Sequence, residues 1–99
     1  MADRLRFAWD SRKASANLRK HGVAFEEAQT VFADDNALLL DDPGHSQVED
    51  RSVMLGLSAR LRILVVSHTI RDGGHTIRII SARKATKREC GQYFEQVMP

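Results

Sequence analysis

The amino-acid sequence predicts an α+β fold, with a small, mainly antiparallel sheet on which two N-terminal helices and one C-terminal helix pack. Three observations predict this class. Apolar residues alternate or cluster in short runs typical of strands, capping residues mark helix starts, and tight-turn sequences join the later strands. Of the 99 residues, 42% are hydrophobic, enough for one modest core, so we expect a single domain over residues 1–99.

The N-terminal part of the chain predicts one strand followed by two helices. The strand is expected at residues 5–9 and the helices at about residues 12–21 and 25–33. Asp10 or Ser11 can cap the first helix, and Gly22 can end it in the left-handed conformation. Phe25, Ala28 and Phe32 are spaced to form the buried side of the second helix.

The remainder predicts four strands and a last helix. The strands are expected at residues 37–40, 51–57, 61–70 and 77–82, and the helix at residues 86–96. The third of these strands is the most apolar and is expected in the middle of the sheet. Asp72-Gly73-Gly74 is typical of a hairpin turn, and Thr86-x-x-Glu89 is a capping box. Sequence alone leaves the register of the last two strands open.

Charge is distributed unevenly along the chain. Residues 1–22 and 71–99 each contain six Lys or Arg, whereas residues 34–50 contain six acids and no Lys or Arg. The net charge is only +2. Two basic ends and an acidic middle indicate one face suited to a polyanion, although clustered charges also occur on ordinary protein surfaces.

Composition limits the remaining classes of function. Cys90 is the only cysteine, so neither an intramolecular disulfide nor a cysteine-based metal cluster can form. No apolar run is long enough to span a membrane, and the first residues lack the apolar stretch of a signal peptide. We therefore expect a cytoplasmic protein without membrane association. Because no His or carboxylate spacing is typical of a metal site, we also expect no metal and no cofactor.

The segment from Ile77 to Tyr93 is the most informative. A buried strand leads directly into a basic helix start, and helix N-termini attract anions. The cations gathered there are Arg78, Arg83, Lys84, Lys87 and Arg88. This junction indicates a partner that carries phosphate.

Several ordered blocks of the chain resemble the BrnT toxins. The first block runs from Phe7 to Ala28 and includes Trp9-Asp10, Lys13, Asn17, Lys20-His21-Gly22 and Phe25-Glu26-Glu27-Ala28. The later blocks are Asp42-Pro43-x-His45-Ser46, Glu49-x-Arg51, Gly56-x-Ser58 and Ile77 to Thr86, followed by Glu89 and Tyr93. One departure is Ala24, which stands where the family usually has a capping Ser or Thr.

The resemblance implies a ribonuclease toxin of a type II toxin–antitoxin pair, with a RelE-like fold, that blocks translation and growth. It also implies a BrnA-type antitoxin with a ribbon-helix-helix domain, a hetero-oligomeric complex, and contact with operator DNA only through that antitoxin. RNA is then the substrate.

Metal-independent RNA cleavage needs a base for the 2′-hydroxyl, cations for the charge on the phosphate and an acid for the leaving oxygen. The catalytic candidates are Arg83, Arg78, Arg51, Glu49, His45 and Tyr93. Guanidinium groups match phosphate oxygens, but Arg78 can instead pair with an acid across the sheet. Glu49 and Arg51 form either a base and a clamp or a salt bridge.

The other assignments also have structural alternatives. Tyr93 can stack on a base or donate a proton, or it can pack its ring on the sheet. Glu89 is explained by the capping box. Among the histidines, His45 is preferred as the base, then His68, then His21.

The candidate RNA-binding residues combine the basic helix start with one side of the first helix. They are Lys13, Asn17, Lys20, His21, Lys84, Lys87 and Arg88. On the first helix such side chains can track an RNA backbone or can simply be solvated. Two other functions remain open for the chain, a non-catalytic nucleic-acid-binding or regulatory module and a structural protein whose basic face binds an acidic peptide.

Overall fold

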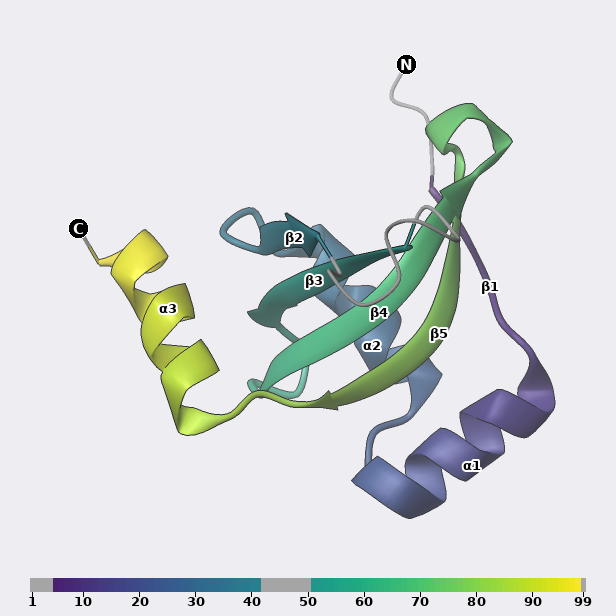
Figure 1. Ribbon diagram of the computed structural model, residues 1–99, viewed down its shortest axis with the longest axis horizontal. Coiled ribbons are helices and arrows are strands. Elements are labelled where there is room, and N and C mark those ends of the chain that lie inside the picture. The colour runs from purple at the N-terminus through teal and green to yellow at the C-terminus, as the bar shows by residue number, and fades with distance from the viewer. Residues whose placement is uncertain (1–4, 42–50, 99) are drawn as a thin grey trace.

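A computed structural model describes residues 5–41 and 51–98. The elements in chain order are β1 (Arg6–Ala8), α1 (Ser11–His21), α2 (Phe25–Thr30), the 3-10 turn η1 (Val31–Ala33), β2 (Leu38–Asp41), β3 (Arg51–Leu57), β4 (Ile63–Arg71), the 3-10 turn η2 (Asp72–Gly74), β5 (Thr76–Lys84) and α3 (Lys87–Val97). Figure 1 shows a sheet with α2 behind it, α1 beside β5, and α3 beyond the end of β5. The predicted α+β class is confirmed.

The five strands are ordered β1-β5-β4-β3-β2, with the apolar strand β4 in the middle as predicted. Strands β2 to β5 are antiparallel to their neighbours, and β1 adds a short parallel edge to β5. A bulge interrupts the β4–β5 ladder, because Ser67 pairs with Ser81 but His68 pairs with Ile79. This observation gives the register that the sequence left open.

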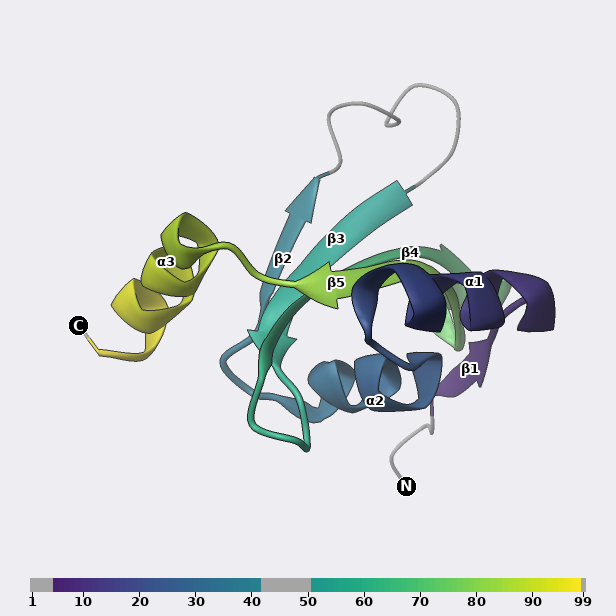
Figure 2. The same ribbon diagram turned by 90° about the horizontal axis from the view of Figure 1, so that it is seen from below.

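The main core lies between the sheet and the two N-terminal helices. Its fully buried side chains include Phe25, Val31, Leu64, Val66 and Ile79. Figure 2 shows α1 and α2 on this side of the sheet. Asp10 caps α1 by accepting hydrogen bonds from two backbone N–H groups, and Gly22 ends it with φ 69°, both as predicted.

A smaller core lies on the opposite face, where Leu55, Val65 and Tyr93 are buried. Of the residues of α3, only Tyr93 is buried, and Glu89 also joins the helix to β5 through its ion pair with Arg83, whereas the rest of the helix extends past the end of the sheet (Figure 2). The C-terminal helix thus contacts the sheet, as predicted, through these two side chains. No helix of the described residues covers the rest of this face, and we call it the open face.

A charged network that the sequence did not predict anchors α2. Glu27 is buried and forms an ion pair with Arg62, which directly precedes β4. Ser58 Oγ also donates a hydrogen bond to Glu27 Oε2 at 2.7 Å. The hydrogen bond from the Arg62 guanidinium is the main reason that the pKa of Glu27 is lowered, although burial acts to raise this pKa. Two of the blocks quoted above, around Glu27 and around Ser58, therefore meet in a structural contact.

Candidate functional site

The open face is organised in rows of side chains across β3, β4 and β5. One row contains Arg51, Thr69 and Arg78, the next Val53, Ser67 and Ser81, and the third Leu55, Val65 and Arg83. Paired residues of neighbouring strands point to the same side of a sheet. The bulge is essential here, because simple alternation along β5 would place Arg83 on the side of Ile79, in the helix-covered core. It returns Arg83 to the face that carries Arg78.

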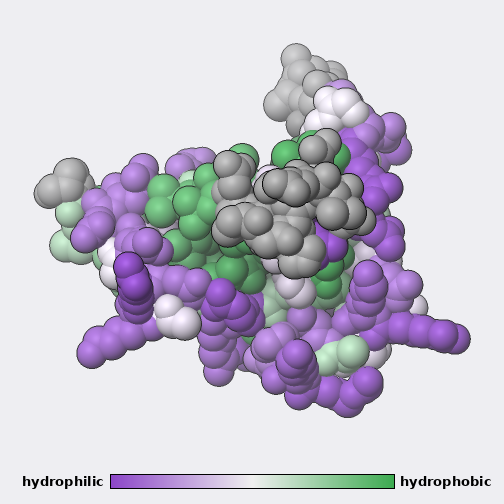
Figure 3. Space-filling model, in the orientation of Figure 1, coloured by the Kyte–Doolittle hydropathy of each residue, from purple (hydrophilic) through white to green (hydrophobic). Residues whose placement is uncertain are grey.

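A pocket of about 270 Å³ opens at the middle of this face. Its lining residues are Leu40, Val53, Val65, Ser67, Ser81, Arg83 and Glu89. We call it the sheet pocket. Figure 3 shows hydrophobic side chains between α3 and the middle of the sheet, with hydrophilic side chains around them. The pocket thus combines apolar walls with two hydroxyls, one guanidinium and one carboxylate.

Arg83 and Glu89 form a bidentate ion pair at the edge of this pocket. Arg83 Nη1 and Nη2 donate to the two carboxylate oxygens of Glu89 at 2.8 and 2.9 Å. The same carboxylate accepts from the backbone N–H of Thr86 at 2.8 Å, completing the predicted capping box of α3. The guanidinium is the main reason that the pKa of Glu89 falls to about 2, and Glu89 raises the pKa of Arg83 in return.

The two other arginines considered as phosphate clamps, Arg51 and Arg78, lie toward the opposite end of the open face from Arg83. Arg51 on β3 and Arg78 on β5 flank the buried Thr69 on β4, and both are half-buried. Arg78 contributes weakly to lowering the pKa of Asp10, whose main hydrogen bonds come from the first turn of α1. The structure therefore brings Arg51 and Arg78 together, about two rows from Arg83.

Tyr93 is packed rather than presented to a substrate. Its side chain is 4% exposed, and its hydroxyl donates to Asp34 Oδ2 at 2.7 Å. Burial first, and then the Asp34 carboxylate, raise the pKa of Tyr93 to about 12. Burial acts to raise the pKa of Asp34, but hydrogen bonds from the Leu57 N–H and from Tyr93 outweigh it and lower that pKa. The packing alternative for Tyr93 is the one observed.

The structure describes two of the three preferred histidines. His68 is 1% exposed within the helix-covered core, where burial lowers its pKa and its Nδ1 lies 3.1 Å from the Val66 carbonyl oxygen. The structure therefore places His68 in the core and away from the open face. His21 is half-buried in the last turn of α1. His45 and Glu49 lie outside the described residues.

On α1 the expected polar ridge is interrupted. Lys13 and Lys20 are exposed, but Asn17 is buried at 6% exposure. Its amide donates to the Val23 and Ala82 carbonyl oxygens at 2.9 and 2.8 Å and accepts from the Ala82 N–H at 3.0 Å. Asn17, predicted as an RNA-binding residue, thus lies buried with its amide occupied by backbone groups, and it joins α1 to β5.

The basic residues around the start of α3 are accessible. Lys84, Lys87 and Arg88 are all exposed. They lie close to Arg83 in the chain, but Lys84 pairs with the core residue Leu64 and therefore points away from the open face.

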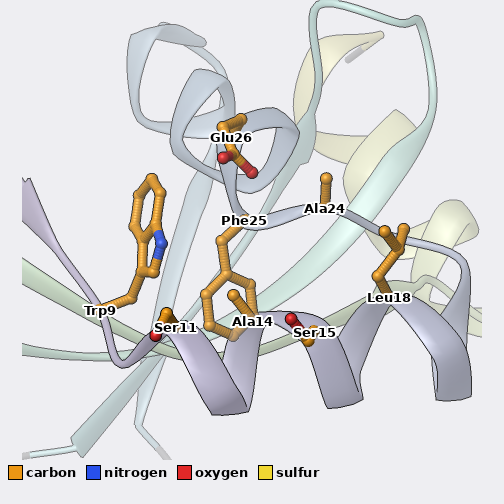
Figure 4. A pocket seen from close by; sticks show the side chains of 8 residues that line it. All are labelled: Trp9, Ser11, Ala14, Ser15, Leu18, Ala24, Phe25 and Glu26. Carbon is orange, nitrogen blue, oxygen red and sulfur yellow. The ribbon is translucent and has the colours of Figure 1, made fainter.

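A second pocket of about 280 Å³ lies between α1 and α2 and is called the helix pocket. Figure 4 shows Trp9 and the Glu26 carboxylate directed toward a floor of Ala14 and Phe25, with Ser15 beside them. The edge of the Trp9 ring meets Phe25 with ring centroids 5.9 Å apart. This pocket is on the helix-covered side, away from the open face.

The described part of the chain, residues 5–41 and 51–98, contains neither a metal-binding cluster nor a membrane-spanning helix. No group of three or more His, Cys, Asp or Glu side chains there could hold a metal ion. None of its helices is both long and apolar enough to cross a membrane.

Comparison with known proteins identifies the family. Residues 9–89 match the sequence model described as the ribonuclease toxin BrnT of a type II toxin–antitoxin system. The chain belongs to the BrnT family. The matched range includes the whole sheet pocket and both members of the Arg83–Glu89 pair.

The fold is also that of a solved BrnT structure. The crystal structure of the Brucella abortus ribonuclease toxin BrnT superposes with a TM-score of 0.64 at 24% sequence identity, covering 84% of this chain and 99% of that chain. No curated protein matches this chain. The chain is thus an α+β member of a family of ribonuclease toxins, and as a type II toxin it has an antitoxin partner.

Sequence reasoning missed several polar residues of the open face. Ser67 and Ser81 line the sheet pocket but stand in apolar strands, where a serine carries no signal of its own. Their pairing across β4 and β5 depends on the bulge. Only the register of the ladder could have revealed them.

Proposed function

We propose that this chain is a metal-independent endoribonuclease whose substrate phosphate binds in the sheet pocket. The observation that carries the proposal is the position of Arg83, whose guanidinium borders the pocket beside Ser67 and Ser81. A guanidinium offers two parallel donors to a phosphate, and hydroxyls can donate to its other oxygens. We further propose that residues 1–99 form one toxin domain.

The reaction needs no group other than protein side chains and RNA. The 2′-oxygen attacks the neighbouring phosphorus, its proton passes to a base, and the bond to the 5′-oxygen breaks as that oxygen gains a proton. The products are a 2′,3′-cyclic phosphate and a 5′-hydroxyl. Arg83 stabilises the extra negative charge on the phosphate oxygens as the new bond forms.

In the free protein Glu89 occupies the donors that the phosphate would use. A phosphate in the pocket therefore competes with Glu89 for Arg83, and binding includes opening of this ion pair. With its pKa near 2, paired Glu89 is a weak base. Glu49 and His45 are therefore the candidates for the base and the acid. Arg51 and Arg78 supply further positive charge on the same face as Arg83.

We also propose the cellular setting that the family suggests. RNA cleavage in the cytoplasm blocks translation and growth, and a BrnA-type antitoxin with a ribbon-helix-helix domain neutralises the toxin in a hetero-oligomer that reaches operator DNA through the antitoxin. The antitoxin segment covers the basic side of the open face, residues 78–93. Deuterium exchange of the complex should show protection there, and protection confined to residues 34–50 would contradict this placement.

The test is RNA cleavage by purified protein in EDTA. Wild type should cut RNA and leave cyclic phosphate or 3′-phosphate ends, whereas Arg83→Ala should lose about a hundredfold or more in rate. Arg60→Ala is the matched control, because Arg60 is an exposed arginine in the turn between β3 and β4 and does not line the sheet pocket. Equal cleavage by wild type and Arg83→Ala would refute the role of Arg83.

A non-catalytic RNA-binding module is the second candidate. It is favoured by the described lining of the sheet pocket, in which Glu89 is the one titratable acid or base and is held by Arg83. If wild type binds RNA with steep salt dependence but cuts it neither alone nor in a translation extract, this second function replaces the first.

A further inference from the structure

A single row of four side chains crosses the open face at the sheet pocket. From β2 to β5 its members are Leu40, Val53, Ser67 and Ser81, each paired with the next. All four line the pocket. The row spans three strand spacings, about 14 Å, and two aliphatic side chains are followed in it by two hydroxyls. The pocket therefore has an apolar half over β2 and β3 and a polar half over β4 and β5.

The polar half lies beside Arg83. Ser81 precedes Arg83 by two residues on β5, which places the two side chains on one face about 7 Å apart along the strand. Ser67 lies opposite Ser81 on β4, one strand further from Arg83. In the part of the chain that the structure describes, neither hydroxyl is hydrogen-bonded to another residue. A phosphate held by Arg83 and Ser81 therefore leaves the Ser67 hydroxyl available to a second group of the ligand.

The apolar half is unsuited to a phosphate. Leu40 is 42% exposed and Val53 is half-buried, so both present aliphatic carbon to a ligand. Figure 3 shows hydrophobic side chains at the surface between α3 and the middle of the sheet. A charged phosphate loses hydration against such a wall and gains no hydrogen bond from it. A flat ring with apolar faces and polar edges, such as a nucleobase, matches a wall of this kind next to a hydroxyl.

The size of the pocket agrees with one nucleotide. Its volume of about 270 Å³ lies just below the range of about 300–1,000 Å³ that is typical of pockets for drug-sized ligands. The pocket can therefore hold one base next to a phosphate, but no larger ligand. Within a nucleotide the ribose separates the phosphate from the base, and in the pocket the polar half similarly separates Arg83 from the aliphatic wall.

We propose that Leu40, Val53 and Ser67 form a base-binding site for the nucleotide whose phosphate contacts Arg83, and that Ser67 discriminates among the bases. This inference rests on the proposed function and deepens it, since it makes the sheet pocket the place where RNA sequence is read. The face of the base packs on Leu40 and Val53, and its edge forms a hydrogen bond with Ser67 Oγ. A hydroxyl both donates and accepts, so its partner on the base can be a carbonyl oxygen, a ring nitrogen or an amino group.

The test measures binding of short strands that cannot be cut, because they lack the attacking 2′-hydroxyl. Four fluorescein-labelled deoxytetranucleotides each contain one type of base, a fifth is abasic with the same phosphates, and dissociation constants are measured by anisotropy. Wild type should bind at least one base-bearing tetramer about fivefold or more tighter than the abasic tetramer. Ser67→Ala should change the affinity ratio between the best- and worst-bound bases by about two- to tenfold and leave the abasic tetramer unchanged.

Leu40→Ala and its matched control Leu39→Ala test the aliphatic wall. Leu39 is the neighbouring residue on β2, is 56% exposed, and pairs with Met54 on the helix-covered side. Leu40→Ala should weaken binding of the base-bearing tetramers about two- to fivefold without affecting the abasic one. Leu39→Ala should bind all five like wild type, and thermal unfolding checks that each variant is folded.

Arg83→Ala separates this inference from the proposed function. It should weaken binding of all five tetramers, the abasic one included, because it removes the phosphate contact. If wild type binds abasic and base-bearing tetramers equally, the base-binding site is overturned while the phosphate site stands. Equal effects of Leu40→Ala and Leu39→Ala, or a loss in Ser67→Ala that the abasic tetramer shares, would also overturn it. Absence of binding of all five tetramers by wild type overturns both the base-binding site and the proposed function.

Discussion

Glu89 is the residue for which the structure allows the most quantitative prediction. Its carboxylate accepts hydrogen bonds from Arg83 and from the Thr86 N–H, so it stabilises both the ion pair and the start of α3. Glu89→Gln removes the charge and keeps the shape. Because glutamine also serves in a capping box, the variant isolates the ion pair from the cap.

The expected loss of stability follows from the pKa. A fall from 4.5 to about 2 corresponds to about 3 kcal/mol at neutral pH if it is transferred fully into unfolding free energy. The Arg83 side chain is 41% exposed, so water screens the pair and the expected loss is about 1–2 kcal/mol.

The pH dependence has a definite sign. The folded-state pKa of Glu89 is lowered, so its stabilisation is complete above the unfolded value of 4.5 and is lost as the pH falls toward about 2. Urea unfolding of wild type and Glu89→Gln should therefore show a difference of about 1–2 kcal/mol at pH 7 that shrinks below pH 4. Other carboxylates titrate equally in both proteins and cancel.

Glu95→Gln is the matched control, because Glu95 is exposed on the same helix. It should differ from wild type by less than about 0.5 kcal/mol at every pH. A Glu89→Gln difference that is equally large at pH 7 and pH 3 would show that the ion pair is not its source. The reasoning would also fail if the variant were as stable as wild type at pH 7.

Asn17 and Tyr93 are both buried and hydrogen-bonded to distant parts of the chain. Asn17→Ala should lower the unfolding free energy by about 3 kcal/mol in urea titrations, because it leaves buried backbone groups without partners; a loss below 1 kcal/mol would contradict this role. Tyr93→Phe should lower it by about 1–2 kcal/mol, because the hydrogen bond to Asp34 is lost. The same variant should keep the wild-type rate of RNA cleavage once folded, and a hundredfold lower rate would restore a catalytic role for Tyr93.

Local chemistry explains what the sequence could predict. Four predicted features depend only on residues close together in the sequence. They are the cap at Asp10, the left-handed Gly22, the capping box of Thr86 and Glu89, and the central position of the apolar strand β4. Such features are determined by neighbouring side chains and backbone groups, so their residue types are sufficient to identify them.

Contacts between distant residues were not predictable in the same way. Asn17 bonds to Ala82, which is 65 residues away, and Tyr93 bonds to Asp34, which is 59 residues away. On a single sequence both polar side chains look available for a ligand, because only tertiary packing shows that their hydrogen-bonding atoms are occupied. The ion pair between Glu27 and Arg62, which are 35 residues apart, could not be predicted for the same reason.

The bulge in β5 connects these two kinds of information. Arg78 and Arg83 are an odd number of residues apart, and in an unbroken strand they would point to opposite faces, which would leave one guanidinium in the helix-covered core. Ile80 has no partner in the β4–β5 ladder, and this one extra residue turns Arg83 outward while Ala82 turns inward. The bulge interrupts the hydrogen bonds between β4 and β5, and in return it places two cations on one face of the sheet. Deleting Ile80 would place the two arginines four residues apart, so an unbroken strand would also hold both on the open face, and the bulge is what accommodates the odd spacing of this sequence.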